Sequence, residues 1–161
     1  MARGTGVGID IGAHAIRIVE LRITEKGAGI RKALLFDRAA LRERGVDPAD
    51  RTKVAALLKR EMAAAGISAR DAVLGISGKD SIIRYAHVPP VPAWRLKKIM
   101  DYEVGEVAEK IGEKLTSDFR VLPVTRDSDD DQAIIIGLAK EPSLEEIEAA
   151  VLAAGYAPAI G

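Results

Sequence analysis

The sequence predicts an α+β protein of the broad α/β class, built from two parts with different orders of elements. From position 7 onward, apolar residues alternate with glycine and polar residues, which is typical of β-strands. Two stretches, 48–65 and 92–111, instead repeat their apolar residues with helical spacing. Glycine and proline separate these patterns, so strands and helices are expected in a mixed order.

The first part begins with three predicted strands. Alternation over 7–11 predicts the first strand, and a second is expected over 15–23. The apolar phase of the second strand changes between Ile18 and Val19, so we expect a β-bulge there or burial on both faces. Glycines at 27 and 29 then lead into a third strand over 30–36. The short connections predict a three-stranded antiparallel meander.

A helix and a short strand complete this part. Asp47 followed by Pro48 predicts a helix start, with the aspartate as N-cap and the proline at the first helical position. Gly66 predicts the helix end, and the apolar run 72–76 predicts a strand.

The second part has the predicted order strand–helix–strand–strand–helix. A strand over 81–88 ends at two prolines, and a long helix is expected from Pro92 to Ile111. Strands follow near 119–124 and 133–139, separated by an acidic turn at 126–131. The spacing of Ser143 and Glu146 matches a capping box, which predicts that the last helix begins at Ser143; Gly155 predicts its end.

Composition excludes several classes of function. Lysine plus arginine balances aspartate plus glutamate, 24 against 24, and aromatic residues are few, so no nucleic-acid partner is expected. There is no cysteine, and the two histidines, His14 and His87, do not suffice for a zinc site. No apolar run approaches the roughly 20 residues needed to span a bilayer, and no signal peptide is apparent. We therefore expect a cytoplasmic protein without direct membrane insertion.

Asp10 ends the first predicted strand, and Gly12 follows it in a tight turn. Such a turn can aim backbone N–H groups at a phosphate, while the aspartate holds a hydrated Mg²⁺ nearby. Arg17 would add charge-assisted hydrogen bonds. The alternative is a β-hairpin that simply needs glycine at its turn. The residues of the turn leave both interpretations open.

The same residues resemble the first phosphate motif of actin-like ATPases and are most similar to the PilM family, which is related to FtsA. Positions 6–12 read Gly-Val-Gly-Ile-Asp-Ile-Gly, and positions 16–21 read Ile-Arg-Ile-Val-Glu-Leu. The resemblance continues through Ile82-Ile83-Arg84 and Val88-Pro89-Pro90-Val91-Pro92, into the helix with Tyr102-Glu103, and on to 149–156. It covers essentially the whole chain, and the acidic turn is its least similar part.

The resemblance implies a truncated actin-like lobe of the ribonuclease H type, interrupted by an inserted strand-helix-strand-strand module. Residues 1–78 would form the incomplete ribonuclease H-type subdomain, and residues 79–158 the inserted module together with a last helix. Residues 159–161 would start a truncated return strand. The chain is therefore expected to be an N-terminal fragment of a longer protein.

Membership of this family would imply an adaptor role in type IV pilus assembly. The expected protein is cytoplasmic, is held at the inner membrane through its partners, and binds the N-terminal tail of the membrane protein PilN. Other pilus assembly proteins and a homo-oligomer are further expected partners. No nucleophile–base pair stands out, so this chain is not expected to be an enzyme, and the full-length protein is expected to be at most a weak ATPase.

The resemblance assigns ATP and Mg²⁺ to Asp10, Gly12, Ala13, His14 and Arg17, with Asp10 holding the metal through water. Two departures from the family pattern matter. Positions 13–15 read Ala-His-Ala, where relatives carry small hydroxyl residues, and Arg17 stands near the position of the family's lysine. The second phosphate loop and the adenosine pocket would also lie in an absent lobe. ATP and Mg²⁺ are therefore expected in the full-length protein and not in this fragment.

The strand over 82–88 is the predicted partner site. Ile83 and Tyr85 should share one face with Arg84 between them, and a short extended peptide is expected alongside, in the groove between the two subdomains. Glu103 falls inside the apolar stripe of the long helix, which indicates either contact with a partner or a carboxylate that reaches solvent at the stripe edge.

Two other functions share this superfold. A phosphotransferase such as a sugar kinase has the same aspartate–glycine hairpin, but its insertions lie elsewhere than after Ile76. An FtsA-like cell-division scaffold has an insertion at this point, but the passage Val88-Pro89-Pro90 is more similar to PilM.

Overall fold

The structure is a computed structural model of the 161-residue chain that describes residues 4–123 and 131–159. The acidic turn predicted at 126–131 lies outside the described residues except for Asp131. The chain divides into two compact units. One unit runs to Ser77 and resumes at Leu144, and the other spans Gly78–Ser143.

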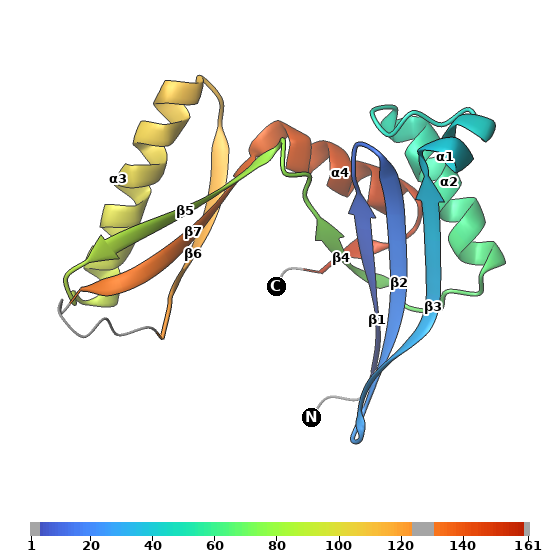
Figure 1. The fold of residues 1–161 in the computed structure, drawn as a ribbon, viewed down its shortest axis with the longest axis horizontal. Coiled ribbons are helices and arrows are strands. Elements are labelled where there is room, and N and C mark those ends of the chain that lie inside the picture. Colours follow the sequence, from blue (N-terminus) through green and yellow to red (C-terminus); the bar gives the residue numbers. More distant parts are fainter. Residues whose placement is uncertain (1–3, 124–130, 160–161) are drawn as a thin grey trace. The chain divides into compact units, whose positions relative to one another are not determined.

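The first unit contains a five-stranded sheet with the order β3-β2-β1-β4-β8. Its strands are β1 (Gly4–Ile11), β2 (Ala15–Thr24), β3 (Gly27–Asp37), β4 (Asp71–Gly75) and β8 (Ala157–Pro158). Strands β1, β2 and β3 form the predicted antiparallel meander, whereas β4 runs parallel to both β1 and β8 (Figure 1).

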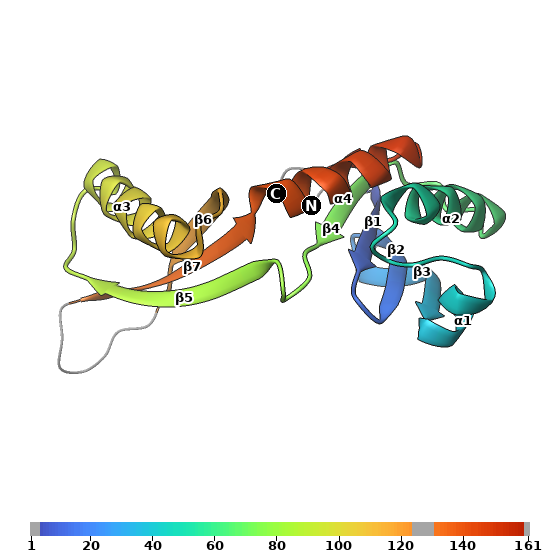
Figure 2. The same ribbon diagram turned by 90° about the horizontal axis from the view of Figure 1, so that it is seen from above.

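Three helices supply the rest of this unit: α1 (Arg38–Glu43), α2 (Arg51–Ala64) and α4 (Glu141–Ala153). Their buried side chains pack with alternate residues of the strands, because every second residue of a strand points to the same face. The core contains Val7, Ile9, Ile11, Ile16, Ile18, Phe36, Leu41, Val54, Leu57, Leu58, Met62, Ile67, Ala69, Ala72, Ile147, Val151, Ala154 and Tyr156. Helices α2 and α4 lie along the same side of the sheet (Figure 2).

Two local predictions for this unit need correction. The β-bulge lies between Glu20 and Leu21, where Arg31 of β3 is the extra residue, and not between Ile18 and Val19. Ile18 is buried and Val19 half-buried, which agrees with the alternative prediction of burial on both faces. The N-cap of α2 is Asp50, whose carboxylate accepts a hydrogen bond from Lys53 N (3.1 Å). Asp47 instead accepts from Ala49 N (2.9 Å) in the preceding turn, so both aspartates have capping chemistry but only the second begins the helix.

The short helix α1 was not predicted. It follows β3 directly, and the Asp37 carboxylate accepts a hydrogen bond from Ala40 N (2.8 Å) at its N-terminus. Six residues make fewer than two turns, which is too short for a clear apolar periodicity.

The second unit is a three-stranded antiparallel sheet, order β5-β7-β6, with one face covered by a helix (Figure 2). Its elements are β5 (Ser81–Val88), α3 (Ala93–Ile111), β6 (Leu115–Val121) and β7 (Gln132–Lys140). Their buried core contains Val88, Leu96, Met100, Ile134, Ile136 and Leu138. The order strand–helix–strand–strand is the predicted inserted module, although β6 begins four residues earlier than expected.

The last helix, α4, was predicted to be part of this module, but most of it belongs to the first unit. Residues 79–158 were predicted to form one module, but α4 belongs to the first unit from Leu144 onward. Its Ile147 and Val151 are buried in that core, which is the physical reason for the difference. Helix α4 also begins at Glu141, so Ser143 lies inside its first turn and is not the cap.

A short strand, β8, pairs with β4 but covers only Ala157–Pro158, so it ends before the return strand predicted at 159–161. Residues 160 and 161 lie outside the described part of the chain. In residues 4–123 and 131–159, no helix is both long and apolar enough to cross a membrane.

Candidate functional site

The parallel strands β1 and β4 end side by side, and this edge carries the predicted phosphate turn. Asp10 pairs with Gly75 at the carboxyl end of the two strands. A Cβ atom at Gly75 would lie 3.1 Å from Asp10 Oδ1 and 3.4 Å from Asp10 Cα. Glycine at this position therefore leaves open the space beside the carboxylate. The carboxyl ends of strands in α/β sheets are common ligand sites.

The turn after β1 holds its glycine for reasons of space. Gly12 N donates a hydrogen bond to Ala15 O (3.0 Å), and a Cβ at Gly12 would lie 3.3 Å from that oxygen. Its backbone does not adopt a positive φ angle. The close approach of the two chain segments, more than an unusual backbone conformation, therefore favours glycine here.

Arg17 and Asp10, two of the residues predicted at this turn, form an ion pair. Arg17 Nη1 lies 2.9 Å from Asp10 Oδ2, and the two side chains are 58% and 41% exposed. Pairs this exposed contribute little to stability, about 0–1 kcal/mol. The pair is therefore available to exchange its partner for a ligand at small energetic cost.

Ala13 and His14 are both exposed at the tip of the turn. Ala13 also borders a hollow of about 290 Å³ that includes Arg38, Arg42 and Asp47. Neither arginine has an ion-pair partner among the residues that the structure describes. Positive charge next to the turn suits an anion, although no feature of the sequence pattern pointed to these two arginines.

Three of the four predicted partner residues lie on β5, at one edge of the second unit's sheet. Ile83 and Tyr85 are 59% and 67% exposed and lie opposite Gly137 and Ile135 on the face away from α3. Arg84 lies opposite the buried Ile136, so it belongs to the helix-covered face. Because β5 is an edge strand, Arg84 remains exposed despite lying on that face.

Glu103 is half-buried on α3, close to the flank of its apolar stripe. The structure describes no hydrogen bond or ion pair between this carboxylate and the β5 residues. The four predicted partner residues thus share one unit but do not form a joined cluster.

Comparison with known proteins identifies the fold. No family model and no curated protein sequence matches this chain. A solved PilM-PilN type IV pilus biogenesis complex matches with a TM-score of 0.75 at 20% identity, over 99% of this chain and 47% of that one. The cytoplasmic domain of EpsL, an inner membrane component of the type II secretion system of Vibrio cholerae, matches with a TM-score of 0.60 at 13% identity, over 97% of this chain and 56% of that one.

The chain has a PilM-like fold. It spans about half the length of both solved structures. The match confirms the α+β fold that the sequence resemblance predicted.

The side chains at the β1–β4 edge match only some of the requirements of a site for ATP and Mg²⁺. Asp10 has one carboxylate oxygen, Oδ1, next to the open space at Gly75, and a hydrated Mg²⁺ binds such an oxygen through water. Arg17 supplies a guanidinium for a phosphate, but Ala13 supplies no hydroxyl. No group of three or more histidine, aspartate or glutamate side chains that could hold a metal directly occurs in the described residues.

A buried glutamate, which the sequence pattern did not distinguish, fixes the loop before β4. Glu20 is fully buried, and its Oε1 accepts hydrogen bonds from Ser68 N (2.7 Å), Ser68 Oγ (3.0 Å) and Ala69 N (2.9 Å). Arg31 Nη1 lies 3.5 Å from the other oxygen, Oε2, which has no hydrogen-bond partner among the described residues. The contacts join β2 to a loop almost fifty residues away, and that loop leads into the strand that carries Gly75.

The pKa of Glu20 reflects two opposed effects. Burial raises the pKa of its carboxyl, but the hydrogen bonds from Ala69 and Ser68 and the charge of Arg31 outweigh burial. The pKa of Glu20 is therefore lowered from its ordinary value of 4.5, and the group is ionised at neutral pH. The only sequence signal for this role was a charged residue at a position in phase with the buried Ile16 and Ile18.

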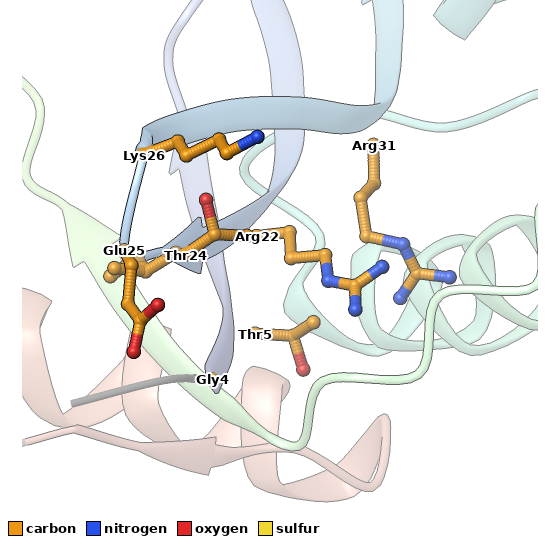
Figure 3. A pocket seen from close by; sticks show the side chains of 8 residues that line it. Gly4, Thr5, Arg22, Thr24, Glu25, Lys26 and Arg31 are labelled. Carbon is orange, nitrogen blue, oxygen red and sulfur yellow. The ribbon is translucent and has the colours of Figure 1, made fainter.

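Another hollow of the first unit is lined by none of the predicted site residues (Figure 3). It measures about 860 Å³, is widely open to solvent, and lies at the far end of the meander. It is lined by Gly4, Thr5, Arg22, Ile23, Thr24, Glu25, Lys26 and Arg31. We call the buried Glu20 and its contacts with Ser68, Ala69 and Arg31 the Glu20 anchor, so Arg31 belongs both to this anchor and to the lining of the hollow. Figure 3 shows Arg31 on the same side of the strands as Arg22 and Thr5. An open, mixed-charge hollow of this kind does not by itself indicate a ligand.

Proposed function

We propose that this chain is the actin-like part of a cytoplasmic adaptor for type IV pilus assembly. The observation that carries the proposal is the structural match to PilM in a PilM-PilN complex over 99% of the chain. The second match, to an inner-membrane component of a secretion system, supports an adaptor of the same general kind. The proposed partner is the N-terminal tail of a PilN-like inner-membrane protein, which would hold the adaptor at the membrane beside other pilus assembly proteins.

The edge of β5 is the proposed docking position for the tail. In the described residues no strand pairs with the side of β5 that faces away from β7, so an extended peptide can add to the sheet there. Ile83 and Tyr85 present apolar surface on one face of this edge, and Arg84 presents a guanidinium on the other. Backbone pairing would supply affinity, while these side chains would supply selectivity for the tail sequence.

Binding of the PilN-like tail from the same genome, measured by titration calorimetry, tests this proposal. Arg84→Ala should weaken binding by about 1.5–3 kcal/mol, since a hydrogen bond from a charged group is lost. Arg120→Ala is the matched control, because Arg120 is an exposed arginine of the same sheet that pairs with Ile135 on the opposite face. Equal affinity of the two variants and the parent would remove Arg84 from the site, and no binding to the parent protein would reject the adaptor role.

In the longer protein, the edge of β1 and β4 is proposed to bind the phosphates of ATP with Mg²⁺. Asp10 would hold the hydrated metal, and Arg17 would turn from Asp10 to a phosphate. Gly75→Ala would push against Asp10 and should weaken Mg²⁺-ATP binding, whereas Gly78→Ala meets no atom within 4 Å and serves as the control. The 161-residue chain alone should bind ATP weakly or not at all, because it spans about half of the matching PilM structure and the proposed site needs further convergent groups. Micromolar ATP affinity of this chain in calorimetry would contradict that expectation.

A further inference from the structure

Helix α3 carries its charges in two blocks of opposite sign. Residues 93–100 include Arg95, Lys97 and Lys98 and no acidic residue. Residues 101–111 include Asp101, Glu103, Glu106 and Glu109 against a single base, Lys110. The first half therefore has a net charge of about +3 and the second half about −3, from the ordinary ionisation states of these groups.

This distribution is unfavourable with respect to the helix dipole, although Lys97 pairs with Asp101 and Lys110 with Glu106 along the helix. The backbone dipole places partial positive charge at the N-terminus and partial negative charge at the C-terminus, so cations stabilise the last turn and anions the first. In α3 the first turn has no acidic residue, and most of its charges have the sign that adds to the dipole. The fold of the unit does not require this order, because the buried stripe of Leu96, Met100 and Val107 is apolar.

Two large aromatic residues lie on the solvent face of the same helix. Trp94, the only tryptophan of the chain, is 65% exposed, and Tyr102 is 67% exposed. At about 100° per residue, Trp94, Lys98, Tyr102, Gly105 and Glu109 fall on the side opposite the buried stripe. Lys98 Nζ lies 5.6 Å from the centre of the Trp94 ring. Aromatic residues of this kind are enriched in protein interfaces.

We propose that this face of α3 binds the same face of a second copy of the chain, with the two helices antiparallel around a two-fold axis near Tyr102. Such an axis sets the basic half of each helix against the acidic half of the other. Lys98 then lies within one helical turn of Glu106 and Glu109 of the second copy, with the aromatic rings between the helices. Gly105 lacks a side chain at the same face and allows the backbones to approach.

Charge complementarity selects a second copy as the partner. An isologous contact requires a surface that is complementary to itself after rotation, and a helix with one basic and one acidic half meets that requirement. The unfavourable order of charges within one helix becomes favourable between two, because the two dipoles are then antiparallel. A helix of 19 residues, roughly 28 Å long, gives a small interface, so we expect a dissociation constant on the order of 10–100 µM.

Sedimentation of the 161-residue chain from about 1 to 500 µM tests the dimer, and the sole tryptophan reports on the face itself. The parent should change from monomer to dimer over this range, while acrylamide quenching of Trp94 falls in parallel. A chain that stays monomeric, or that dimerises with unchanged quenching, would overturn the proposal.

A mixing experiment separates this interface from any other. In a two-fold symmetric dimer each contact between the helices occurs twice. Lys98→Glu alone or Glu109→Lys alone therefore creates two pairs of like charges, and each variant should dimerise at least about tenfold more weakly than the parent. An equimolar mixture of the two variants restores both pairs and should dimerise about as well as the parent. Lys59→Glu on α2 is the control with the same change of charge, and it should have no effect. Both substitutions are at exposed positions, and circular dichroism verifies that the variants are folded. A mixture of the two folded variants that does not dimerise as well as the parent would therefore also reject the arrangement.

Discussion

The two units bury their sheets to very different extents. In the first unit, side chains from three helices and four strands form one large buried core that also encloses the Glu20 anchor. In the second unit, a single helix covers three strands, and the buried core is one third as large. Large aliphatic residues such as Ile30 and Leu35 are exposed in the first unit as well, but the exposed aromatic residues Tyr85, Trp94 and Tyr102 belong to the second. The first unit is therefore expected to set the stability of the protein, whereas the second presents exposed aromatic side chains to partners.

The strongest test of this difference compares one substitution in both cores. Leu58→Ala in α2 should lower the free energy of unfolding by about 4 kcal/mol, and Leu138→Ala in β7 by about 2.5 kcal/mol. Both leucines are buried, but Leu138 belongs to the smaller core, where we expect the surrounding side chains to relax more easily into the space left by the substitution. Urea unfolding followed by circular dichroism reports on both units, and Trp94 fluorescence reports on the second. Equal losses at the two positions would contradict the comparison.

The Glu20 anchor gives the next largest effect, and it belongs to the first unit alone. Glu20→Ala leaves the N–H groups of Ser68 and of the buried Ala69 without their acceptor and should cost about 3 kcal/mol at pH 7. Glu20→Gln keeps one acceptor oxygen and should cost less, about 1–2 kcal/mol. Urea unfolding at pH 7 measures both values.

The same anchor predicts a pH dependence with a defined sign. Because the pKa of Glu20 is lower in the folded state than its ordinary value of 4.5, ionised Glu20 contributes stability above about pH 4.5. That contribution is lost as the pH falls through the folded-state pKa. The stability difference between the parent and Glu20→Gln should therefore narrow below about pH 4.5, and a constant difference down to about pH 2 would argue against a charge-based role.

A pair of helix-end glycines should show no difference between the units. Gly66 after α2 and Gly112 after α3 both have positive φ angles, +67° and +74°, and at both positions an added Cβ would have no atom within 4 Å. Alanine at either position should cost about 1–2 kcal/mol, because the strain of a left-handed backbone is local. Unequal costs in thermal unfolding would mean that this end of one helix depends on its wider surroundings.

The smallest effects are expected at the exposed charges of the two proposed sites. Asp10→Ala in the first unit and Arg84→Ala in the second should each change stability by less than about 0.5 kcal/mol. Their effects should appear in binding, Asp10→Ala on Mg²⁺-ATP in the longer protein and Arg84→Ala on the tail peptide. A loss of stability above about 1 kcal/mol at either residue would point to a structural role instead.

Much of the secondary structure was predictable because its causes are local. Alternation of apolar residues located the meander, and Gly66 and Gly155 marked helix ends through their positive φ angles. The turn from Asp10 to Gly12 was also predicted, and Arg17 was expected near it, but as a ligand for a phosphate and not as the ion-pair partner of Asp10. Predictions became less accurate where two local signals competed, as at Asp47 and Asp50, or where an element was as short as α1.

The sequence by itself thus determined the elements, the meander and the nature of the turn after β1, since hydrogen bonds and backbone sterics between near neighbours control these features. Only the tertiary structure decided which elements share a core. It assigned α4 to the first unit through Ile147, placed Gly75 beside Asp10, and buried Glu20 against a loop far along the chain. Each of these depends on which distant segments exclude water together, and burial of that kind is a property of the whole fold and not of any local pattern.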